Sequence, residues 1–336
     1  MKFGPLPLAE AEGAVLAHSV RLNGQRLRKG VTLTPAHLAD LARAGETEVI
    51  VARLDPGDVH ENQAAARLAA ALVPDPQAAG LRLTKAFTGR VNLLAEGPGV
   101  AVLDVARLSR LNLINPMITL ATVPACRQMA EGGMVGTVKI ISYAVPGADL
   151  AAACEIARGA VRLARPVLAT ATLIVTEIPG GAGEKGVPAI RGRLAALGMT
   201  LDQVVMVPHR MPEIAEALGR VGSDLALVLT GSATSDPHDV APEALRYAGG
   251  TVERFGMPVD PGNLLFLGDL SDRPVIGLPG CARSPSLNGA DWILSRIACG
   301  LPVFGDDIAG MGVGGLLKEI PTRPQPRDRS RRLNKA

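Results

Sequence analysis

Aromatic side chains are scarce in this sequence of 336 residues, since phenylalanine, tyrosine and tryptophan together make up 2% of it. Proteins that bind nucleic acid commonly stack bases on such rings and present a basic groove to the phosphates. The net charge of +3 does not indicate such a groove, because the positive charge is concentrated at the end of the chain. The last fourteen residues, from Arg323, carry six basic and one acidic side chain. The rest of the chain therefore has a net charge of −2, and we expect no nucleic-acid partner.

Paired metal-binding spacings are also lacking. The four cysteines lie far apart in the sequence, no two of the five histidines have the spacing of metal ligands, and no Ser, His and Asp set is recognisable. No apolar run approaches the ~20 residues that span a bilayer. Because we see no secretory signal either, we expect reduced thiols, no membrane partner and a cytoplasmic location. The cysteines are Cys126, Cys154, Cys281 and Cys299.

Small aliphatic residues are abundant. Hydrophobic residues make up 47% of the chain, and it contains 38 glycines and 26 prolines. A core built from alanine, valine, leucine and isoleucine, with many tight connections, is typical of layered α/β proteins. The length is sufficient for two domains, each with its own core.

The first half of the sequence predicts a smaller mixed α+β domain, residues 1–165. Thr34 can cap a helix that begins at Pro35 and runs to Arg43, with Gly45 as its C-terminal stop. A short β-rich run follows. Further along we predict a second helix, two strands and another helical stretch, at residues 59–72, 99–104, 136–142 and 149–163.

The second half predicts a doubly wound sheet of mostly parallel strands, residues 166–310. The pair Arg165-Pro166 precedes a buried-strand pattern at residues 171–176, and a strand, a Gly- or Pro-containing loop and a helix then recur three times. Residues 311–336 are rich in proline and charge, so we predict a linker or a disordered basic tail there.

One loop of small residues follows the apolar strand that ends at Leu229. Its backbone N–H groups and hydroxyls can approach an anion such as a phosphate closely. Asp236 and Asp239 come next, where carboxylates can hold magnesium. An equally good reading is that Asp239 caps a helix entered at Pro242 and that Asp236 belongs to an ordinary turn. The loop residues are Thr230, Gly231, Ser232, Ala233, Thr234 and Ser235.

Two more loops follow predicted strands. The first contains Gly181 and Lys185; in isolation it is typical of a flexible surface loop, and its position beside the loop after Leu229 favours a ligand role. The second contains Pro279, Gly280 and Arg283, with Arg283 suited to a phosphate. We expect Ser284 to begin the next helix and Cys281 to be a small buried residue. Because open α/β sheets bind ligands beyond the carboxyl ends of their strands, all three loops should meet at one edge.

These motifs resemble those of the molybdopterin-binding domain family. The stretch that ends in Asp239-Val-Ala-Pro-Glu-Ala-Leu245 is similar to the family's Thr-Gly-Gly loop followed by Asp-Val-Thr-Pro-Glu-Ala. Pro261-Gly-Asn263 and Gly277-Leu-Pro-Gly280 look like the molybdopterin molybdenumtransferase branch. The sequence departs from the family at three places: Ser232 replaces the second loop glycine, Cys281-Ala282 replaces Asn-Pro, and His209-Arg210 replaces the acidic pair of the adenylyltransferase branch.

The resemblance implies a three-layer α/β domain that acts in molybdenum-cofactor biosynthesis. It implies that Thr230, Gly231, Ser232 and Ser235 hold the pterin dithiolene phosphate, with Asp236 and Asp239 near magnesium, adenylate or molybdate. Related modules precede a cytidylyltransferase in some bacteria, so a nucleotidyltransferase or a molybdoenzyme-maturation factor is an expected partner. Relatives often assemble through their α/β domains, which suggests a homo-oligomer without identifying an interface.

Three hypotheses follow. In the first, the protein binds molybdopterin or the molybdenum cofactor and presents it for metal insertion or nucleotidyl transfer by electrostatic positioning. In the second, it is a magnesium-dependent molybdenumtransferase or nucleotidyl-pterin hydrolase in which Asp236 and Asp239 are catalytic. In the third, its ligand is another nucleotide, as in the related competence-damage family.

Overall fold

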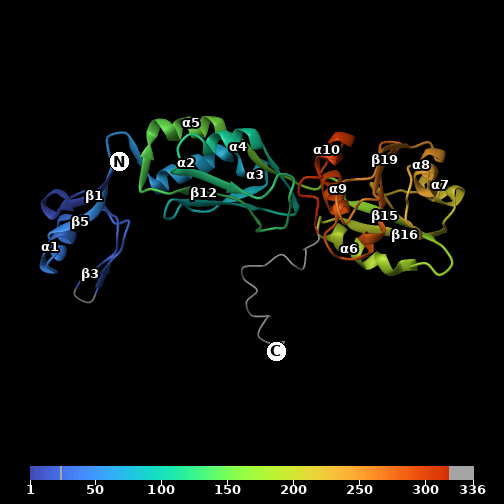
Figure 1. The fold of residues 1–336 in the computed structure, drawn as a ribbon, viewed down its shortest axis with the longest axis horizontal. Coiled ribbons are helices and arrows are strands. Elements are labelled where there is room, and N and C mark those ends of the chain that lie inside the picture. Colours follow the sequence, from blue (N-terminus) through green and yellow to red (C-terminus); the bar gives the residue numbers. More distant parts are fainter. Residues whose placement is uncertain (23–24, 318–336) are drawn as a thin grey trace, which may run out of the picture. The chain divides into compact units, whose positions relative to one another are not determined.

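The chain divides into two compact units, Met1–Arg165 and Pro166–Ala336. The computed structural model describes residues 1–22 and 25–317 (Figure 1). Of the predicted tail, residues 311–336, the part from residue 318 onwards lies outside the described residues.

The N-terminal segment of the first unit is a small antiparallel sheet with one helix. Helix α1 (Pro35–Arg43) is capped by Thr34, whose hydroxyl accepts the N–H of His37, so the predicted helix is confirmed at both ends. Leu41 of this helix packs with Leu33 and Val51 in the segment's core. The other elements are β1 (Lys2–Pro7), η1 (Leu8–Glu10), β2 (Val15–Leu16), β3 (Val20–Leu22), β4 (Gln25–Leu27) and β5 (Glu48–Arg53), with sheet order β1-β5-β2 and a β3-β4 hairpin.

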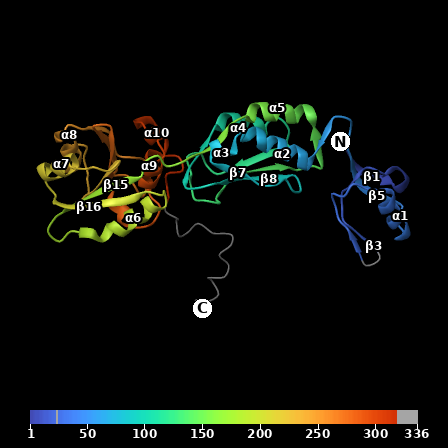
Figure 2. The same cartoon turned by 180° about the vertical axis from the view of Figure 1, so that it is seen from behind.

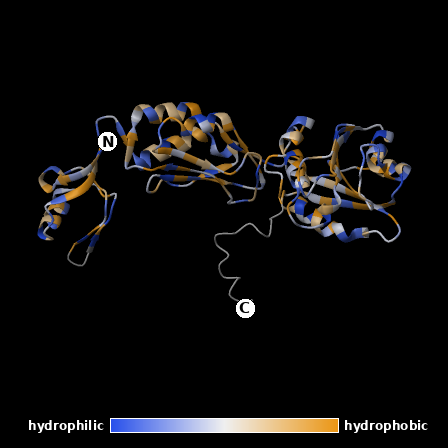
Figure 3. Cartoon of the chain, viewed as in Figure 1, coloured by the Kyte–Doolittle hydropathy of each residue, from blue (hydrophilic) through white to orange (hydrophobic). Residues whose placement is uncertain are grey.

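Helices α2 (Glu61–Leu72) and α5 (Gly147–Ala157) contribute to the core of the remaining part of the first unit. Both carry hydrophobic and hydrophilic stretches, as expected of helices with one buried face (Figure 3). The sheets have the orders β10-β12-β8-β7, β11-β9-β14 and β13-β6. The strands are β6 (Asp58–His60), β7 (Leu81–Leu83), β8 (Arg90–Ala95), β9 (Gly99–Leu103), β10 (Ile118–Thr122), β11 (Gln128–Met129), β12 (Met134–Ile140), β13 (Ala144–Pro146) and β14 (Val161–Ala164), and the short helices are α3 (Pro76–Ala79) and α4 (Val105–Asn112).

The predicted helical stretch at residues 149–163 is wrong in its second part. The helix ends at Ala157, and Gly159 then adopts a left-handed conformation with φ of +67°. Val161–Ala164 forms β14, which pairs antiparallel with β9. The sheet partner thus decides the conformation after Gly159.

A six-stranded sheet forms the centre of the second unit, in the order β16-β15-β17-β20-β19-β18. The first four strands are parallel to one another. Strand β19 pairs antiparallel with β20, and β18 pairs antiparallel with β19. The predicted α/β fold with a mostly parallel sheet is therefore confirmed. The strands are β15 (Thr170–Glu177), β16 (Thr200–Pro208), β17 (Leu225–Leu229), β18 (Thr251–Phe255), β19 (Phe266–Leu270) and β20 (Arg273–Leu278).

Helices cover both faces of this sheet, which makes three layers. Successive residues of β15 point to opposite faces: Leu173 packs with the α6 and α9 side, whereas Ile174 packs with the α7 and α8 side. Figure 2 shows α6 on one side of β15 and β16 and α7 on the other. The helices are η2 (Gly183–Gly186), α6 (Val187–Ala195), α7 (Met211–Gly219), α8 (Val240–Tyr247), η3 (Gly280–Arg283), α9 (Gly289–Ala298) and α10 (Gly305–Gly310).

Phe266 and Gly277 face each other across β19 and β20. The phenylalanine ring lies directly over the glycine, so that a Cβ added at Gly277 would be 1.9 Å from Cε1 of the ring. Phe266 is almost completely buried. The antiparallel end of the sheet is therefore packed around one aromatic ring, which leaves room only for a glycine at the opposite position.

The expectation that Ser284 begins a helix is wrong. Helix α9 begins at Gly289, where Asn288 and Asp291 form a capping box. Ser284 is extended instead, because Arg193 donates hydrogen bonds to the carbonyls of Ser284 and Ser286. A distant guanidinium thus holds this segment outside the helix.

The last described residues pack on the second unit. The N–H of Leu317 donates to the carbonyl of Asp260, and the N–H of Asp260 donates to the carbonyl of Gly315. Met311 is buried in the same core as Leu173. In residues 1–22 and 25–317, no helix has the length and apolar character needed to cross a membrane.

Candidate functional site

Three loops of the second unit meet at the carboxyl ends of β15, β17 and β20. The N–H of Gly231, after β17, donates to the hydroxyl of Thr176 in β15 at 2.8 Å. Nη2 of Arg283, after β20, donates to the carbonyl of Thr230 at 2.6 Å. Parallel strands end at the same edge, and these contacts join the loops there.

Two glycines allow the close approach of these loops. A Cβ at Gly231 would lie 2.6 Å from the carbonyl oxygen of Thr176. A Cβ at Gly186 would lie 2.7 Å from Cδ2 of Leu229 and 2.8 Å from Cγ of Arg283. Glycine is needed at both places because any side chain would push the loops apart.

The loop that follows β17 has a buried beginning and an exposed tip. Thr230 and Thr234 are buried, with their hydroxyl oxygens 3.4 Å apart, whereas Ser232, Ala233 and Ser235 are exposed. The N–H of Gly231 already donates to Thr176, and that of Ser235 donates to Asp239 at 3.0 Å. The exposed residues of the tip thus remain the ones best placed to reach a ligand.

Asp236 and Asp239 act as turn and cap residues in this structure. Oδ1 of Asp239 accepts the N–H of Val240 at 2.7 Å, at the start of α8, while its Oδ2 accepts the N–H of Ser235. Oδ1 of Asp236 accepts the N–H of His238 at 2.8 Å. Across the described part of the chain, no group of three or more His, Cys, Asp or Glu side chains is placed to hold a metal ion. The geometry thus shows that Asp239 caps α8, and the magnesium role of Asp236 and Asp239 stays a prediction.

Glu243 lies one turn into α8 and neutralises the basic groups beside the loop. Its Oε1 accepts hydrogen bonds from Nδ1 of His238 at 2.8 Å and from Nη1 of Arg246 at 2.7 Å. The hydrogen bond to His238 and the charge of Arg246 lower the pKa of Glu243. His238 and Arg246 therefore share one carboxylate partner.

Arg283 is a cation without a carboxylate partner among the described residues. Its guanidinium is partly buried, and burial lowers its pKa. Its Nη2 donates the hydrogen bond to Thr230, whereas its Nε is buried and has no hydrogen-bond partner among the described residues. A desolvated charge of this kind is costly unless an anion compensates it. Arg283 therefore marks the position where this edge can take an anionic group.

The other predicted residues lie around Arg283. Lys185 is exposed in η2, the turn that ends at Gly186 against the arginine. The N–H of Gly181 donates to the carbonyl of Ile178 in a tight turn at 2.9 Å. Pro279 is buried, Gly280 is exposed, and both come directly before η3 carries the chain to Arg283.

Cys281 is exposed in η3, so the expectation of a small buried residue is wrong. The turn of η3 directs it outwards while Ala282 is buried. None of the four cysteines, all of which the structure describes, forms a disulfide.

Sequence reasoning missed Thr176, His209 and Arg193. Thr176 is 1% exposed and bonds to both Gly231 and Nδ1 of His209. Arg193 of α6 donates to the carbonyls of Ala282 and Ser284, on either side of Arg283. A threonine directly after the apolar run Leu173–Val175, near the carboxyl end of the strand, is the signal that would have indicated Thr176.

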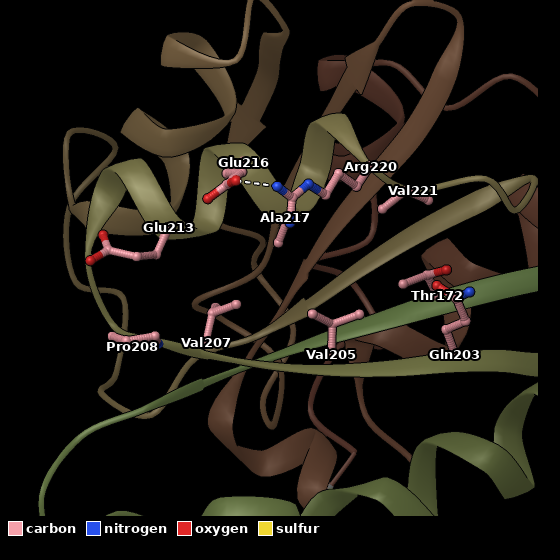
Figure 4. Close-up of a pocket in the computed structure, with 10 residues that line it drawn as sticks. All are labelled: Thr172, Gln203, Val205, Val207, Pro208, Glu213, Glu216, Ala217, Arg220 and Val221. Carbon is pink, nitrogen blue, oxygen red and sulfur yellow. Dashed lines mark hydrogen bonds and ion pairs between the residues drawn. The ribbon is translucent and has the colours of Figure 1, made fainter.

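A separate cleft of 270 Å³ lies between the edge strand β16 and helix α7 (Figure 4). It has an apolar floor that includes Val205 and Val207, and Glu216 and Arg220 form an ion pair at its rim. It shares no residue with the three loops. The lining residues are Thr172, Gln203, Val205, Val207, Pro208, Glu213, Glu216, Ala217, Arg220 and Val221.

The segment that carries this sheet and its loops has a family match. Residues 167–295 match the model of a family described as a probable molybdopterin binding domain. Residues 5–53 match a family described as a domain of unknown function. No curated protein matches the chain. The molybdopterin-binding match covers all six strands of the large sheet and the three loops at its edge.

Solved structures that are similar to this chain include two proteins of molybdopterin biosynthesis. One is the molybdopterin biosynthesis MoeA protein from Pyrococcus horikosii, with 12% identity over 89% of this chain and 75% of that one, and a TM-score of 0.30. The other is the molybdopterin biosynthesis enzyme MoaB from Thermus theromophilus, with 23% identity over 45% of this chain and 100% of that one, and a TM-score of 0.29. Neither likeness is close enough to add to the family match.

Proposed function

We propose that the second unit binds molybdopterin or the molybdenum cofactor at the three-loop edge and takes part in molybdenum-cofactor biosynthesis. The family match of residues 167–295 supports this role. The pterin carries a phosphate, and the edge offers a place for an anion. The single observation that carries the proposal is Arg283, a partly buried guanidinium with no carboxylate beside it among the described residues.

Each loop has a distinct part in the proposed site. Arg283 compensates the phosphate charge, and Lys185 supplies a second cation from exposed η2. Ser232, Ala233 and Ser235, at the exposed tip, present hydroxyl and backbone groups to the ligand. Thr230 and Gly231 hold the base of the loop. The protein would position the pterin phosphate by electrostatics and present it for metal insertion or nucleotidyl transfer by a partner enzyme.

A binding role is favoured over the magnesium-dependent transferase or hydrolase. Both carboxylate oxygens of Asp239 already accept backbone N–H groups, and one oxygen of Asp236 does so too. Magnesium at this pair would share these oxygens with the N–H groups that they already accept. No third His, Cys, Asp or Glu side chain of the described residues is placed with the pair to complete a metal site, so the enzyme hypothesis has less support than the binding hypothesis.

Calorimetric titration tests the proposal. The full chain is titrated with molybdopterin, with inorganic phosphate, and with ATP and CTP in the presence of magnesium. We expect Arg283→Gln to weaken pterin binding about tenfold or more, as expected for loss of a charge-assisted hydrogen bond. The matched control is Arg220→Gln, which changes an exposed arginine that follows α7 and should leave binding unchanged.

Three results would count against it. The absence of pterin binding by the wild-type chain would overturn the proposal. Tight nucleotide binding without pterin binding would favour a ligand of the competence-damage type instead. Consumption of the nucleotide would show that the protein is an enzyme and would favour the transferase or hydrolase hypothesis.

A further inference from the structure

Three neighbouring strand ends are joined through one hydroxyl group. Thr176 is the penultimate residue of β15, His209 follows β16, and Gly231 lies two residues after the end of β17. Oγ1 of Thr176 lies 2.8 Å from the N of Gly231 and 2.8 Å from Nδ1 of His209. The backbone N–H of His209 also donates to the carbonyl of Glu177 at 2.9 Å, which fixes the start of its side chain beside Thr176.

Proton counting fixes the direction of the bond from Gly231 and indicates the direction of the contact with His209. The N–H of Gly231 can only donate, so Oγ1 of Thr176 accepts it. The hydroxyl has one proton of its own, and the histidine nitrogen is the acceptor that the structure gives it. Because Thr176 is 1% exposed, water cannot readily replace that acceptor. The arrangement that also satisfies the hydroxyl proton has Oγ1 of Thr176 donating to an unprotonated Nδ1 of His209, which places the ring proton of the neutral imidazole on Nε2.

The contact between Gly231 and Thr176 leaves little freedom for the loop base. A Cβ at Gly231 would lie 2.6 Å from the carbonyl oxygen of Thr176, so the two backbones are nearly in contact. The residue before Gly231 is Thr230, whose carbonyl accepts the hydrogen bond from Arg283. A rotation of the Thr176 hydroxyl would release the Gly231 N–H and disturb both the loop tip and the arginine.

We propose that His209 is a positioning residue of the ligand loop and acts through Thr176. It accepts the hydroxyl proton of Thr176, which keeps a lone pair of Oγ1 directed at the N–H of Gly231. The base of the loop is thereby held where Ser232 and Arg283 can reach the same anion. The effect on ligand affinity rests on the proposed function, whereas the effect on the Gly231 N–H does not.

Substitutions at His209 can separate its two ring nitrogens. In His209→Asn the amide oxygen reaches the place of Nδ1, whereas in His209→Gln the amide reaches the place of Nε2. His209→Leu has no acceptor at all. Thr176→Val removes the hydroxyl while it preserves the shape of the side chain, and Thr176→Ser keeps the hydroxyl.

The measurements are nitrogen NMR of the His209 ring and hydrogen exchange at the Gly231 amide, both without ligand, followed by titration with inorganic phosphate and molybdopterin. We expect an unprotonated Nδ1 in the wild-type chain. We expect about tenfold faster exchange at Gly231 in His209→Leu, His209→Gln and Thr176→Val, and near wild-type exchange in His209→Asn and Thr176→Ser. Ligand affinity should fall in the same three variants.

A matched control comes from the first unit, where Nδ1 of His37 lies 3.1 Å from the hydroxyl of Thr34. His37→Leu should leave exchange at Gly231 unchanged. A protonated Nδ1 in neutral His209, or unchanged Gly231 exchange in both His209→Leu and His209→Gln, would overturn the inference. If the chain binds no pterin while Gly231 responds as expected, the proposed function fails and the positioning role stands.

Discussion

Nε of Arg193 lies 2.6 Å from Oδ1 of Asp291, in an ion pair whose side chains are only 8% and 11% exposed. The same guanidinium donates to the carbonyls of Ala282, Ser284 and Ser286. One buried cation thus joins α6, α9 and the segment that carries Arg283. Both the stability of the second unit and the shape of the proposed site therefore depend on the guanidinium of Arg193.

Removal of one partner should be strongly destabilising. We expect Asp291→Ala to lower the free energy of unfolding by about 3–5 kcal/mol, because it leaves a buried guanidinium without a counter-charge. The control is Asp40→Ala, which breaks an ion pair with Arg43 at the surface. The side chain of Arg43 is 73% exposed and that of Asp40 is 45% exposed, so the loss should cost about 0–1 kcal/mol. Urea unfolding of the full chain measures both. Equal losses in the two variants would contradict the buried-pair argument.

A second prediction concerns the tight contact at Gly186. Gly186→Ala should cost about 1–3 kcal/mol, because the new methyl group would collide with Leu229 and Arg283. Gly192→Ala, further along in α6, has open space around it and should stabilise the chain by about 0.5–1 kcal/mol through helix propensity. Thermal unfolding of both variants checks the opposite signs. A stabilising Gly186→Ala would show that the loops do not pack as described.

Substitutions at Asp239 distinguish a cap from a metal ligand. Serine is a good N-cap residue but a poor magnesium ligand, so Asp239→Ser should keep the stability of α8. Asp239→Ala should lose about 1 kcal/mol. We expect Asp239→Ser to bind pterin as the wild-type chain does, with the same dependence on magnesium. If magnesium enhances binding in the wild-type chain and this effect disappears in Asp239→Ser, Asp239 is a metal ligand.

Asp224 should make the stability of the chain depend on pH. Hydrogen bonds from the backbone N–H groups of Ala169 and Thr170 lower the pKa of this carboxyl. Because the pKa is lowered in the folded chain, ionised Asp224 stabilises the fold at pH values above the usual pKa range of a carboxyl. This contribution disappears as the pH falls through the lowered pKa. Since Asp224 is exposed, solvent screening limits the contribution to about 1 kcal/mol.

The test compares Asp224→Asn with the wild-type chain in urea at neutral pH and at about pH 3. We expect the variant to be less stable at neutral pH and to approach the wild type in acid. A constant difference between the two chains would show that the charge of Asp224 is not responsible.

Local signals in the sequence predicted the elements that depend on local interactions. Helix α1 was predicted at both ends because Thr34, Pro35 and Gly45 act within a few residues of the helix. Strand β14 was missed, because its conformation depends on pairing with β9. The start of α9 was misplaced for a similar reason, since Arg193 holds Ser284 and Ser286 from a distant helix.

The same limit applies to the candidate site. The loops could be located because parallel strands end at one edge, and the structure joins Thr230 to Arg283 there. The sequence could not show that Thr176 and His209 support Gly231, because that contact depends on the order of β16, β15 and β17 in the sheet. The ligand roles of the loop residues remain predictions for the experiments above.

The pair of Phe266 and Gly277 has a consequence for how this protein can vary. Since a single methyl group at position 277 would overlap the ring, Gly277 cannot be exchanged while Phe266 is kept. An alanine at position 277 becomes acceptable only when a smaller side chain occupies position 266, so the two positions should be inherited as a pair. Homologues with a side chain at position 277 should therefore have a smaller residue at position 266, and libraries that randomise position 277 alone will recover little besides glycine.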